Sequence, residues 1–291
     1  MNIKVEHVDL KYGRRYALKD ICFELSGEKI YGLLGRNGAG KTSLLSLLAS
    51  FREPTAGSIT INGEQPFENR KSMQQVAFLY NKDFKDESDH ALEMLESVQR
   101  YRPHFDNEYA QYLLDRFHID RKKPMKQFSK GMQSALQVVI GLASQAPITI
   151  LDEVYLGMDA PSREIFYKEL LEAQARHPRM MILSTHLVSE MEYLFDEVLV
   201  IHEGKLLLHE EYETLLSKAM TVIGDEEIVA PFVQTKRQLN VQTLGKTKAV
   251  TVFGEFSEAD REEALSQGLA VEPVTLHDLF VHLTERKWSH E

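Results

Sequence analysis

Hydrophobic and polar positions alternate in short runs over the first 63 residues, which predicts strands joined by turns. These runs are IKVEHVDL, ALKDICFEL, KIYGLLG and GSITING, and in the last of them Ile59 and Ile61 alternate with polar neighbours. Between the last two runs, a periodic apolar stretch that opens at Lys41 predicts a helix. From about residue 88 to 145 the apolar positions recur at helical spacing, as in ALEMLESVQRY and EYAQYLLDRF. This region is predicted to be a helical subdomain inserted into an α/β body.

Strand patterns return after the helical region. The segments ITILDE (148–153) and RMMILSTH (179–186) are continuous apolar runs, which are typical of strands covered by helices on both faces. The segment EVLVIHEGKLLLHE predicts a hairpin that turns at Glu203 and Gly204. The chain should therefore hold a parallel sheet between layers of helices.

A different order of patterns begins at about residue 212: strand, helix, strand, strand, helix, strand, helix. The first six elements match the split βαβ order of a ferredoxin-like domain. In the last helix, expected over TLHDLFVHLTERK, Thr275 and Asp278 fit a capping box. One face of that helix is apolar and should be core, with Leu276, Leu279, Phe280 and Leu283.

The composition is that of an ordinary globular protein. With 291 residues, 43% of them hydrophobic, the chain can form one large domain, expected over 1–211, and a smaller α+β domain over 212–291. The net charge of −10 argues against non-specific attraction to nucleic acid or to anionic lipid. The longest apolar run, ALQVVIGLA, is too short to cross a bilayer, so we expect a cytoplasmic protein unless a partner anchors it.

The cysteine and histidine content gives little information about function. The single cysteine, Cys22, excludes a disulfide within the chain and is expected to be a buried small hydrophobe inside a strand. No metal-ligand spacing stands out among the 11 histidines.

A phosphate-binding motif follows the third predicted strand and opens a helix. The segment from residue 35 to 42 matches G-x-x-x-x-G-K-[ST] in full. Its glycines allow successive N–H groups to point at an anion, and the helix behind it adds about half a positive charge. Lys41 would reach the β- and γ-phosphates of a nucleotide, and the Thr42 hydroxyl would ligate Mg²⁺. The alternative is a glycine-rich turn that binds nothing. The residues of the motif are Gly35, Arg36, Asn37, Gly38, Ala39, Gly40, Lys41 and Thr42.

Two acids and a histidine end the later apolar strands. Asp152 and Glu153 close ITILDE, at the edge where parallel sheets bind ligands. Asp152 can hold the metal through water, while Glu153 points to the other face and can orient an attacking water. His186 ends MMILSTH and could bond the γ-phosphate. By themselves the acids would be a helix cap or a solvated edge, and the histidine would be structural.

The order of these motifs resembles the nucleotide-binding subunit of ATP-binding cassette (ABC) transporters over roughly residues 1 to 210. The segment FSKGMQ (128–133) is similar to that family's L-S-G-G-Q signature and lies just ahead of the Asp152 strand. The residue types also fit this role, since Ser129 is a good N-cap and Gly131 leaves the start of the helix open for a phosphate to approach. The fold implied is a P-loop NTPase of the ABC ATPase type, with an antiparallel β subdomain, a parallel-sheet core and an inserted helical subdomain.

The resemblance also implies residue roles. Tyr12 would stack on adenine, phosphate contacts would run on to Ser43, and Asp159 would be the D-loop acid. His186 would be the switch histidine, and Lys41 and Glu153 would join it in catalysis. In the family the signature of one subunit completes the site of another, so Ser129, Lys130, Gly131 and Gln133 would contact ATP across an interface. The expected partners are a second ABC subunit, identical or related, and an integral membrane permease that holds the complex at the inner face of the membrane.

Three departures from the family pattern stand out. Asn81 takes the place of the usual Q-loop glutamine, where it would contact Mg²⁺ with a shorter amide. Lys130 and Met132 alter the signature in a way that resembles bacterial exporters with separate membrane subunits. The segment VYL after Glu153 replaces the family's common Pro-Thr-Ser/Ala segment, which leads to the D-loop.

The sequence thus predicts an Mg²⁺-dependent ATPase that powers an exporter through dimer closure. Three alternatives stay open at this point. They are a soluble ABC ATPase acting on ribosomes or DNA, a nucleotide-sensing module without hydrolysis, and a small-molecule kinase. The last would leave FSKGMQ and Asp159 unexplained, and the first usually carries two cassettes or a long coiled coil.

Overall fold

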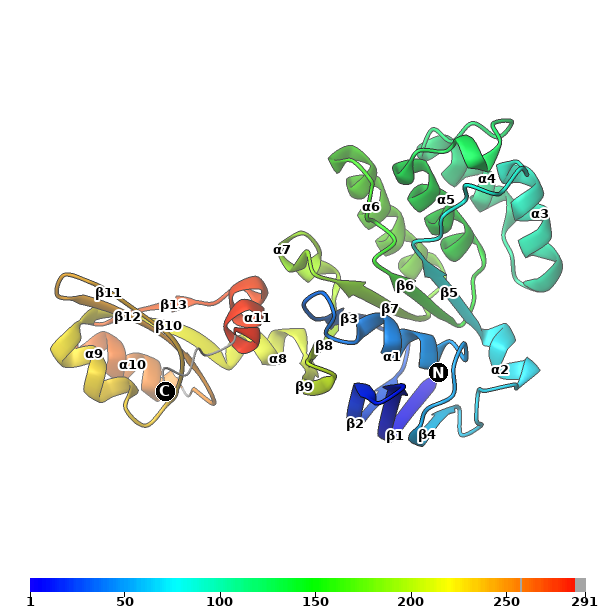
Figure 1. Ribbon diagram of the computed structural model, residues 1–291. Coiled ribbons are helices and arrows are strands. Elements are labelled where there is room, and N and C mark those ends of the chain that lie inside the picture. Colours follow the sequence, from blue (N-terminus) through cyan, green and yellow to red (C-terminus); the bar gives the residue numbers. More distant parts are fainter. Residues whose placement is uncertain (257, 286–291) are drawn as a thin grey trace. The chain divides into compact units, whose positions relative to one another are not determined.

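The computed structural model describes residues 1–256 and 258–285 of the chain and divides them into two units (Figure 1). The first unit comprises Met1–His186 and Leu199–His209, and the second comprises Leu187–Val198 and the residues from Glu210 onward. The segment directly after His186 therefore belongs to the second unit. Position 257 and the last two residues of the expected final helix, at 286 and 287, lie outside the described residues.

An antiparallel sheet of three strands opens the first unit, in the order β2-β1-β4. Its strands are β1 (Asn2–Tyr12), β2 (Arg15–Ser26) and β4 (Ala56–Ile61). Alternate residues of β2 enter the core, including Ile21 and Phe23, and this places Cys22 on the opposite, exposed face. The prediction of a buried Cys22 is wrong, because the period of two that makes the segment a strand also turns the thiol away from the core.

A six-stranded sheet forms the centre of this unit, in the order β5-β6-β7-β3-β8-β9. Its first four strands are parallel to one another. Three of them, β3, β6 and β7, are buried at every position, and for β6 and β7 this burial was predicted. The hairpin turns at Glu203 and Gly204, both at positive φ, as predicted. The bounds are β3 (Ile30–Leu34), β5 (Val76–Tyr80), β6 (Ile148–Asp152), β7 (Met180–Thr185), β8 (Glu197–His202) and β9 (Lys205–Glu211).

Helices cover both faces of the six-stranded sheet (Figure 1). On one side, α1 (Lys41–Leu48) lies between this sheet and the three-stranded sheet, and Leu44, Leu45, Leu47 and Leu48 join the shared core. On the other side lie α3 to α6, which include the inserted helices. The remaining bounds are α2 (Arg70–Gln75), α3 (Ala91–Tyr101), α4 (Asn107–Arg116), a 3₁₀ turn (Met125–Gln127), α5 (Lys130–Ala143) and α6 (Ala160–Arg176). The predicted antiparallel β subdomain, parallel-sheet core and inserted helices are thus all present.

A buried carboxylate ties the inserted helices to α6. Glu169 has no solvent exposure, and its oxygens accept hydrogen bonds from Tyr109 Oη (3.2 Å), Tyr112 Oη (3.0 Å) and Arg116 Nε (3.1 Å). Burying a carboxylate is costly unless donors surround it, and here three do. The three donors all lie on α4, so this cluster fixes α4 against α6.

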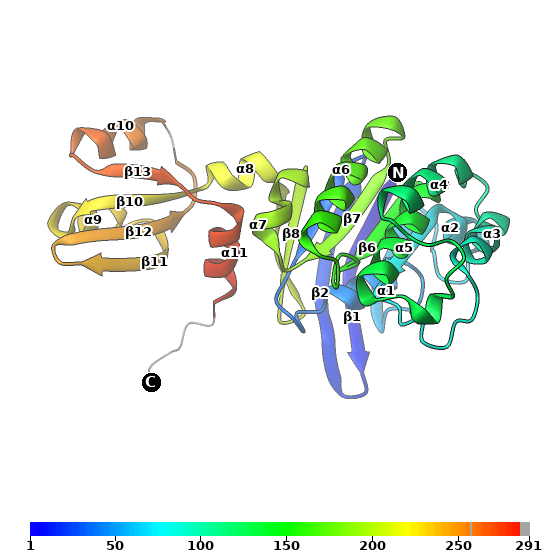
Figure 2. The ribbon, with the colours of Figure 1, turned by 90° about the horizontal axis from the view of Figure 1, so that it is seen from above.

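The second unit contains a four-stranded antiparallel sheet in the order β11-β12-β10-β13 (Figure 2). Helices α9 and α10 cover one face, where Val229, Val233 and Ala264 pack against valines of β10 and β12. Helix α11 starts at a Thr275 cap whose Oγ1 accepts from the Asp278 amide. The elements are α7 (Val188–Met191), a 3₁₀ turn (Glu192–Leu194), α8 (Tyr212–Ser217), β10 (Ala219–Asp225), α9 (Glu226–Val233), β11 (Arg237–Leu244), β12 (Thr247–Phe253), α10 (Glu258–Ser266), β13 (Ala270–Pro273) and α11 (Leu276–Thr284).

Candidate nucleotide site

The glycine-rich turn joins β3 to α1 at the carboxyl edge of the six-stranded sheet. Gly38 (φ 81°) and Gly40 (φ 111°) adopt left-handed backbone that favours glycine. Gly35 is required for a different reason, because a Cβ there would lie 2.8 Å from both the Cγ2 and the carbonyl oxygen of Ile201. These constraints turn the chain tightly in front of the start of α1, where helix amides without a helical partner favour an anion.

The Lys41 side chain contacts both the glycine-rich turn and Glu153, which follows the end of β6. Its side chain is 6% exposed, and its Nζ donates to the carbonyl oxygens of Gly35 (2.7 Å) and Arg36 (3.5 Å). The same amine lies 3.1 Å from Oε1 of Glu153. A buried ammonium is thus held at the mouth of the turn by two carbonyl groups and one carboxylate.

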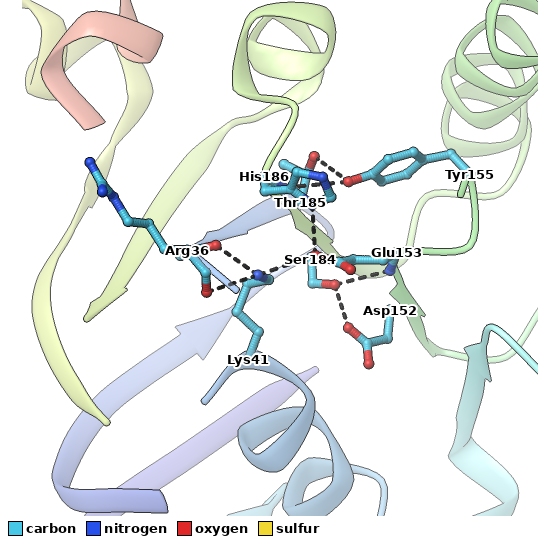
Figure 3. Close-up of polar contacts among 9 residues, drawn as sticks. Arg36, Lys41, Asp152, Glu153, Tyr155, Ser184, Thr185 and His186 are labelled. Atoms are coloured by element: carbon cyan, nitrogen blue, oxygen red, sulfur yellow. Dashed lines mark hydrogen bonds and ion pairs between the residues drawn. The ribbon is translucent and has the colours of Figure 1, made fainter. Parts of the chain in front are cut away.

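Glu153 is the junction of the site (Figure 3). Its Oε1 contacts Lys41 and also accepts a hydrogen bond from Nδ1 of His186 at 3.0 Å, which fixes the hydrogen on Nδ1 because a carboxylate only accepts. Burial raises the pKa of Glu153, but the His186 hydrogen bond and the Lys41 charge outweigh it, so its pKa lies below the ordinary 4.5. The carboxylate is therefore ionised at neutral pH. Glu153 also has a positive φ of 49°, a strained backbone for a residue with a side chain.

Residues without a predicted role also hold Glu153 and His186 in place. Ser184 Oγ donates to Asp152 Oδ1 (2.5 Å) and accepts from the Glu153 amide (3.0 Å). The buried Tyr155 hydroxyl lies 2.9 Å from Thr185 Oγ1 and accepts from the His186 amide at 3.4 Å. The signal for Tyr155 was present in the sequence as the departure VYL. Ser184 and Thr185 carried no signal beyond their place before His186.

Three further predicted residues lie at the end of β1, at the start of α1 and directly after β5. Tyr12, at the end of β1, is 46% exposed, with its hydroxyl 3.4 Å from Ser43 Oγ and the Arg52 guanidinium 5.0 Å from its ring centre. Thr42 is exposed at the start of α1. Asn81 follows β5 directly and is exposed as well, and the residue before it, Tyr80, is in register with Asp152 on the neighbouring strand.

The FSKGMQ segment opens α5 as predicted. Ser129 is its N-cap, and its hydroxyl accepts from the Met132 amide at 3.2 Å. Gly131 faces the loop after Glu153, since a Cβ on it would lie 2.8 Å from the Gly157 carbonyl oxygen. Lys130 is exposed, whereas Gln133 is buried and its amide donates to the Phe128 carbonyl oxygen at 3.2 Å.

Asp159 lies at the end of the loop that Gly131 contacts. It caps α6, and its Oδ1 accepts from the Ser162 amide at 3.0 Å. Hydrogen bonds from Ser162 lower the pKa of this exposed carboxyl below its ordinary value. The structure therefore brings Lys41, Asp152, Glu153 and His186 into one group, and it places Ser129, Gly131 and Asp159 around the starts of α5 and α6.

The donor set fits a nucleotide with Mg²⁺. Turn amides and one buried ammonium suit phosphate oxygens. The oxygen donors at this edge, which are the Thr42 hydroxyl, the Asp152 carboxylate and the Asn81 amide, are of the kind that Mg²⁺ prefers. Asp152 is 6% exposed and is oriented by Ser184, which suits a carboxylate at a metal site.

Comparison with known proteins agrees with the fold. Residues 18–155 match the family model described as ABC transporter. The Nod factor export ATP-binding protein I of Burkholderia orbicola is 30% identical over 209 residues, which is 70% of this chain and 68% of that protein. The lantibiotic transport ATP-binding protein SrtF of Streptococcus pyogenes is 28% identical over 213 residues, covering 72% of this chain and 91% of that protein.

Solved structures show the same fold. An ATP-binding subunit of an ABC transporter superimposes with a TM-score of 0.67 at 22% identity, over 74% of this chain and 92% of that one. A dimeric ATP-binding cassette in a post-hydrolysis state, bound to ADP and Pi, gives a TM-score of 0.63 at 19% identity, over 72% of this chain and 98% of that one. The fold of the first unit is thus that of an ATP-binding cassette.

The chain belongs to the family of ABC transporter ATP-binding proteins. It is an ATP-binding ATPase of that family, and the predicted family, fold class and ATPase activity are confirmed. Within residues 1–256 and 258–285, no helix is long and apolar enough to span a membrane.

Proposed function

We propose that the chain hydrolyses ATP with Mg²⁺ between two ABC subunits and thereby powers export through a separate membrane permease. The observation that carries this proposal is the ionised Glu153 carboxylate, held between Lys41 and His186 beside the phosphate-binding turn. Relatives named for Nod factor export and lantibiotic transport support the exporter assignment.

Each residue of the predicted site has a role in this proposal. The turn from Gly35 to Ser43 and the Lys41 ammonium hold the phosphates, and Tyr12 stacks on the adenine. Thr42, Asp152 and Asn81 would hold Mg²⁺, which would shield the phosphate charge when bound. Across the interface, Ser129, Lys130, Gly131, Gln133 and Asp159 approach the nucleotide of the other subunit. The exposure of Ser129 and Lys130 at the start of α5 supports that approach, whereas the amide nitrogen of Gln133 is already occupied by the Phe128 carbonyl oxygen.

Glu153 performs the proton chemistry. Its carboxylate orients a water molecule and accepts a proton from it as the water attacks the γ-phosphate. His186 positions that carboxylate through the 3.0 Å hydrogen bond, and Tyr155 in turn accepts from the His186 amide. Lys41 lies 3.1 Å from the carboxylate and balances its charge, and the same ammonium would balance the phosphates. The strained φ of Glu153 is consistent with a side chain that is aimed by its surroundings.

An aromatic cluster next to Asn81 supports a permease partner. Phe51, Phe78 and Tyr80 form the cluster, with ring centres 5.2 to 6.2 Å apart. Phe51 is 57% exposed and Tyr80 is 39% exposed, so the cluster offers apolar surface to another protein. Because Tyr80 directly precedes Asn81, a permease segment docked there would be coupled to the metal edge. This attachment would hold the protein at the inner face of the membrane.

The experiment compares the wild type with Glu153→Gln and with Glu164→Gln, an exposed acid on α6 that serves as the matched control. Phosphate release should fall by about 10²- to 10⁴-fold in Glu153→Gln and stay unchanged in Glu164→Gln. Gel filtration with Mg-ATP should show a dimer accumulating in Glu153→Gln. Phosphate release that survives in Glu153→Gln would overturn the role of this carboxylate, and a strictly monomeric Glu153→Gln with Mg-ATP would overturn the interfacial site.

A second experiment addresses the partner. Co-purification from membranes should recover a polytopic membrane protein with the wild type and much less of it with a Phe51→Ser, Tyr80→Ser double variant. Recovery of ribosomes in place of a membrane protein would favour the soluble alternative. Unchanged recovery by the double variant would show that the membrane protein does not dock on the aromatic cluster.

A further inference from the structure

Three different metal-binding side chains converge on the exposed face of the β1–β2 hairpin. They are His7 on β1 and Asp20 and Cys22 on β2, and their ligand atoms all lie within 4.8 Å of one another. His7 Nδ1 is 2.8 Å from Asp20 Oδ1 and 3.5 Å from Cys22 Sγ. Within residues 1–256 and 258–285 this is the one such group of three. Nothing in the ATPase site uses these residues.

The fold builds this convergence with irregular backbone. The β1–β2 register shifts between Val5 and Val8, and both His7 (φ 49°) and Asp20 (φ 52°) adopt left-handed conformations. Strand β4 pairs with the other edge of β1. A Cβ at Gly57 of β4 would lie 2.3 Å from the His7 carbonyl oxygen, so only glycine fits beside the bulge. Asp9 Oδ1 accepts from the Asp20 amide at 2.8 Å and holds that residue's backbone. Bulges re-aim side chains, and here the bulge places His7 beside Cys22.

The geometry argues against a Cys-His-Asp catalytic relay. A relay uses both ring nitrogens, one toward the nucleophile and the other toward the acid. Here both Asp20 Oδ1 and Cys22 Sγ lie near the same atom, Nδ1 of His7. Three donor atoms that share one small volume are arranged as ligands around a common point.

We propose that His7, Asp20 and Cys22 form a binding site for Zn²⁺ or a similar borderline transition-metal ion. Imidazole, thiolate and carboxylate are the ligands of zinc, whereas Mg²⁺ prefers oxygen alone. Around a tetrahedral ion with bonds of about 2.0 to 2.3 Å, donor atoms lie about 3.3 to 3.7 Å apart. The 3.5 Å between Nδ1 and Sγ meets that spacing, and the 2.8 Å between Nδ1 and Oδ1 has to open by about 0.5 Å.

The exposure of the site sets its character. The side chains of His7 and Asp20 are 80% and 69% exposed, so a fourth position faces solvent and can take water or a donor from another molecule. On binding, the Cys22 thiol releases its proton to solvent and the thiolate ligates the ion. The ion should therefore exchange with solvent and bind more weakly as pH falls.

Cobalt offers a sharp test because Cys22 is the only cysteine of the chain. Titration of the nucleotide-free full chain with Co²⁺ should produce one sulfur-to-cobalt charge-transfer band with a stoichiometry of one ion per chain, and Zn²⁺ should abolish the band. Cys22→Ser should lose the band entirely, and His7→Ala and Asp20→Asn should weaken Co²⁺ binding by roughly tenfold or more. His104→Ala, an exposed histidine elsewhere, is the matched control and should bind as the wild type does.

Circular dichroism of each variant keeps the result interpretable, since the substituted side chains are exposed and the variants should fold. Absence of the charge-transfer band in folded wild type would overturn the proposal. A band that persists undiminished in both His7→Ala and Asp20→Asn would overturn it too, because Cys22 would then bind the ion with other ligands. ATP hydrolysis plays no part in the readout, so failure here leaves the proposed function standing.

Discussion

The Nδ1 atom of His186 lies 3.0 Å from Oε1 of Glu153, which joins the ends of the adjacent strands β7 and β6. The two residues come from segments more than thirty positions apart in the chain. Because β6 and β7 are parallel and in register, they end at the same edge of the sheet, and the residues that directly follow them, Glu153 and His186, meet there. The pH behaviour of the enzyme should depend on this hydrogen bond.

His186→Ala should shift the acid limb of activity upward. In the wild type the Glu153 pKa lies below 4.5, so ionisation of this residue does not limit activity above that pH. Removing His186 deletes a hydrogen bond that lowers the pKa and leaves burial, which raises it, less opposed. A pH–rate profile of the residual ATPase activity should show its acid limb at higher pH than in the wild type. An unshifted limb would mean that Lys41 alone sets the pKa.

The same hydrogen bond links stability to pH. A carboxyl group whose folded pKa is depressed stabilises the fold above its unfolded pKa, and this contribution is lost as pH falls through the folded value. Urea unfolding of the wild type and His186→Ala should therefore differ most at neutral pH, and the difference should shrink as the solution is acidified toward the Glu153 pKa.

Tyr155→Phe should loosen the strand end that carries His186. The substitution removes the hydroxyl that contacts Thr185 Oγ1 at 2.9 Å and leaves that buried group without this partner. We expect a loss of about 1 to 2 kcal/mol in the free energy of unfolding. The ATPase rate should fall as well, because the His186 amide loses its acceptor. Tyr167→Phe, which alters a buried tyrosine of α6, is a comparison for the general cost of a lost hydroxyl.

Gly131→Ala tests the packing of the FSKGMQ segment against the loop after Glu153. The new methyl group would lie 2.8 Å from a backbone carbonyl oxygen, so the start of α5 or the loop must move. Over-packing of this kind costs about 1 to 3 kcal/mol. Thermal unfolding should report that cost, and Mg-ATP-dependent dimerisation should weaken. A Gly131→Ala variant with wild-type stability would contradict the prediction, because the loop after Glu153 would then move aside without cost.

Tyr109→Phe tests the buried carboxylate between α4 and α6. Glu169 would keep Tyr112 and Arg116 but lose one of its three donors. Hydrogen bonds to charged groups contribute about 1.5 to 3 kcal/mol, so the free energy of unfolding should fall by about that amount. Tyr112→Phe should cost less because its side chain is 41% exposed. The two losses should not add, since both donors serve one carboxylate. Additive losses in a double-mutant cycle would contradict a shared network.

Much of the fold follows from local pattern. Continuous apolar runs predicted the buried strands β6 and β7, because a strand covered on both faces needs no polar side. The Ser129 and Thr275 caps were predicted as well, since a cap depends only on a side chain and amides within one helical turn. The glycine-rich turn could likewise be placed between its strand and its helix from spacing alone.

The sequence by itself determined the elements, the phosphate-binding turn and the residues proposed to carry the chemistry, because each depends on neighbours within a few positions. Only the tertiary structure decided which distant groups meet. It placed Tyr155 beside Thr185, Ser184 against Asp152, Gly131 against Gly157, and His7 beside Cys22. Sheet register and bulges fix these encounters, and they depend on how whole strands pair. A single chain position carries no record of its partner across a sheet, and for that reason the contact between His7 and Cys22 could not be predicted. The exposure of Cys22 is different, because the alternation of Ile21 and Phe23 around it already places the thiol on the opposite face.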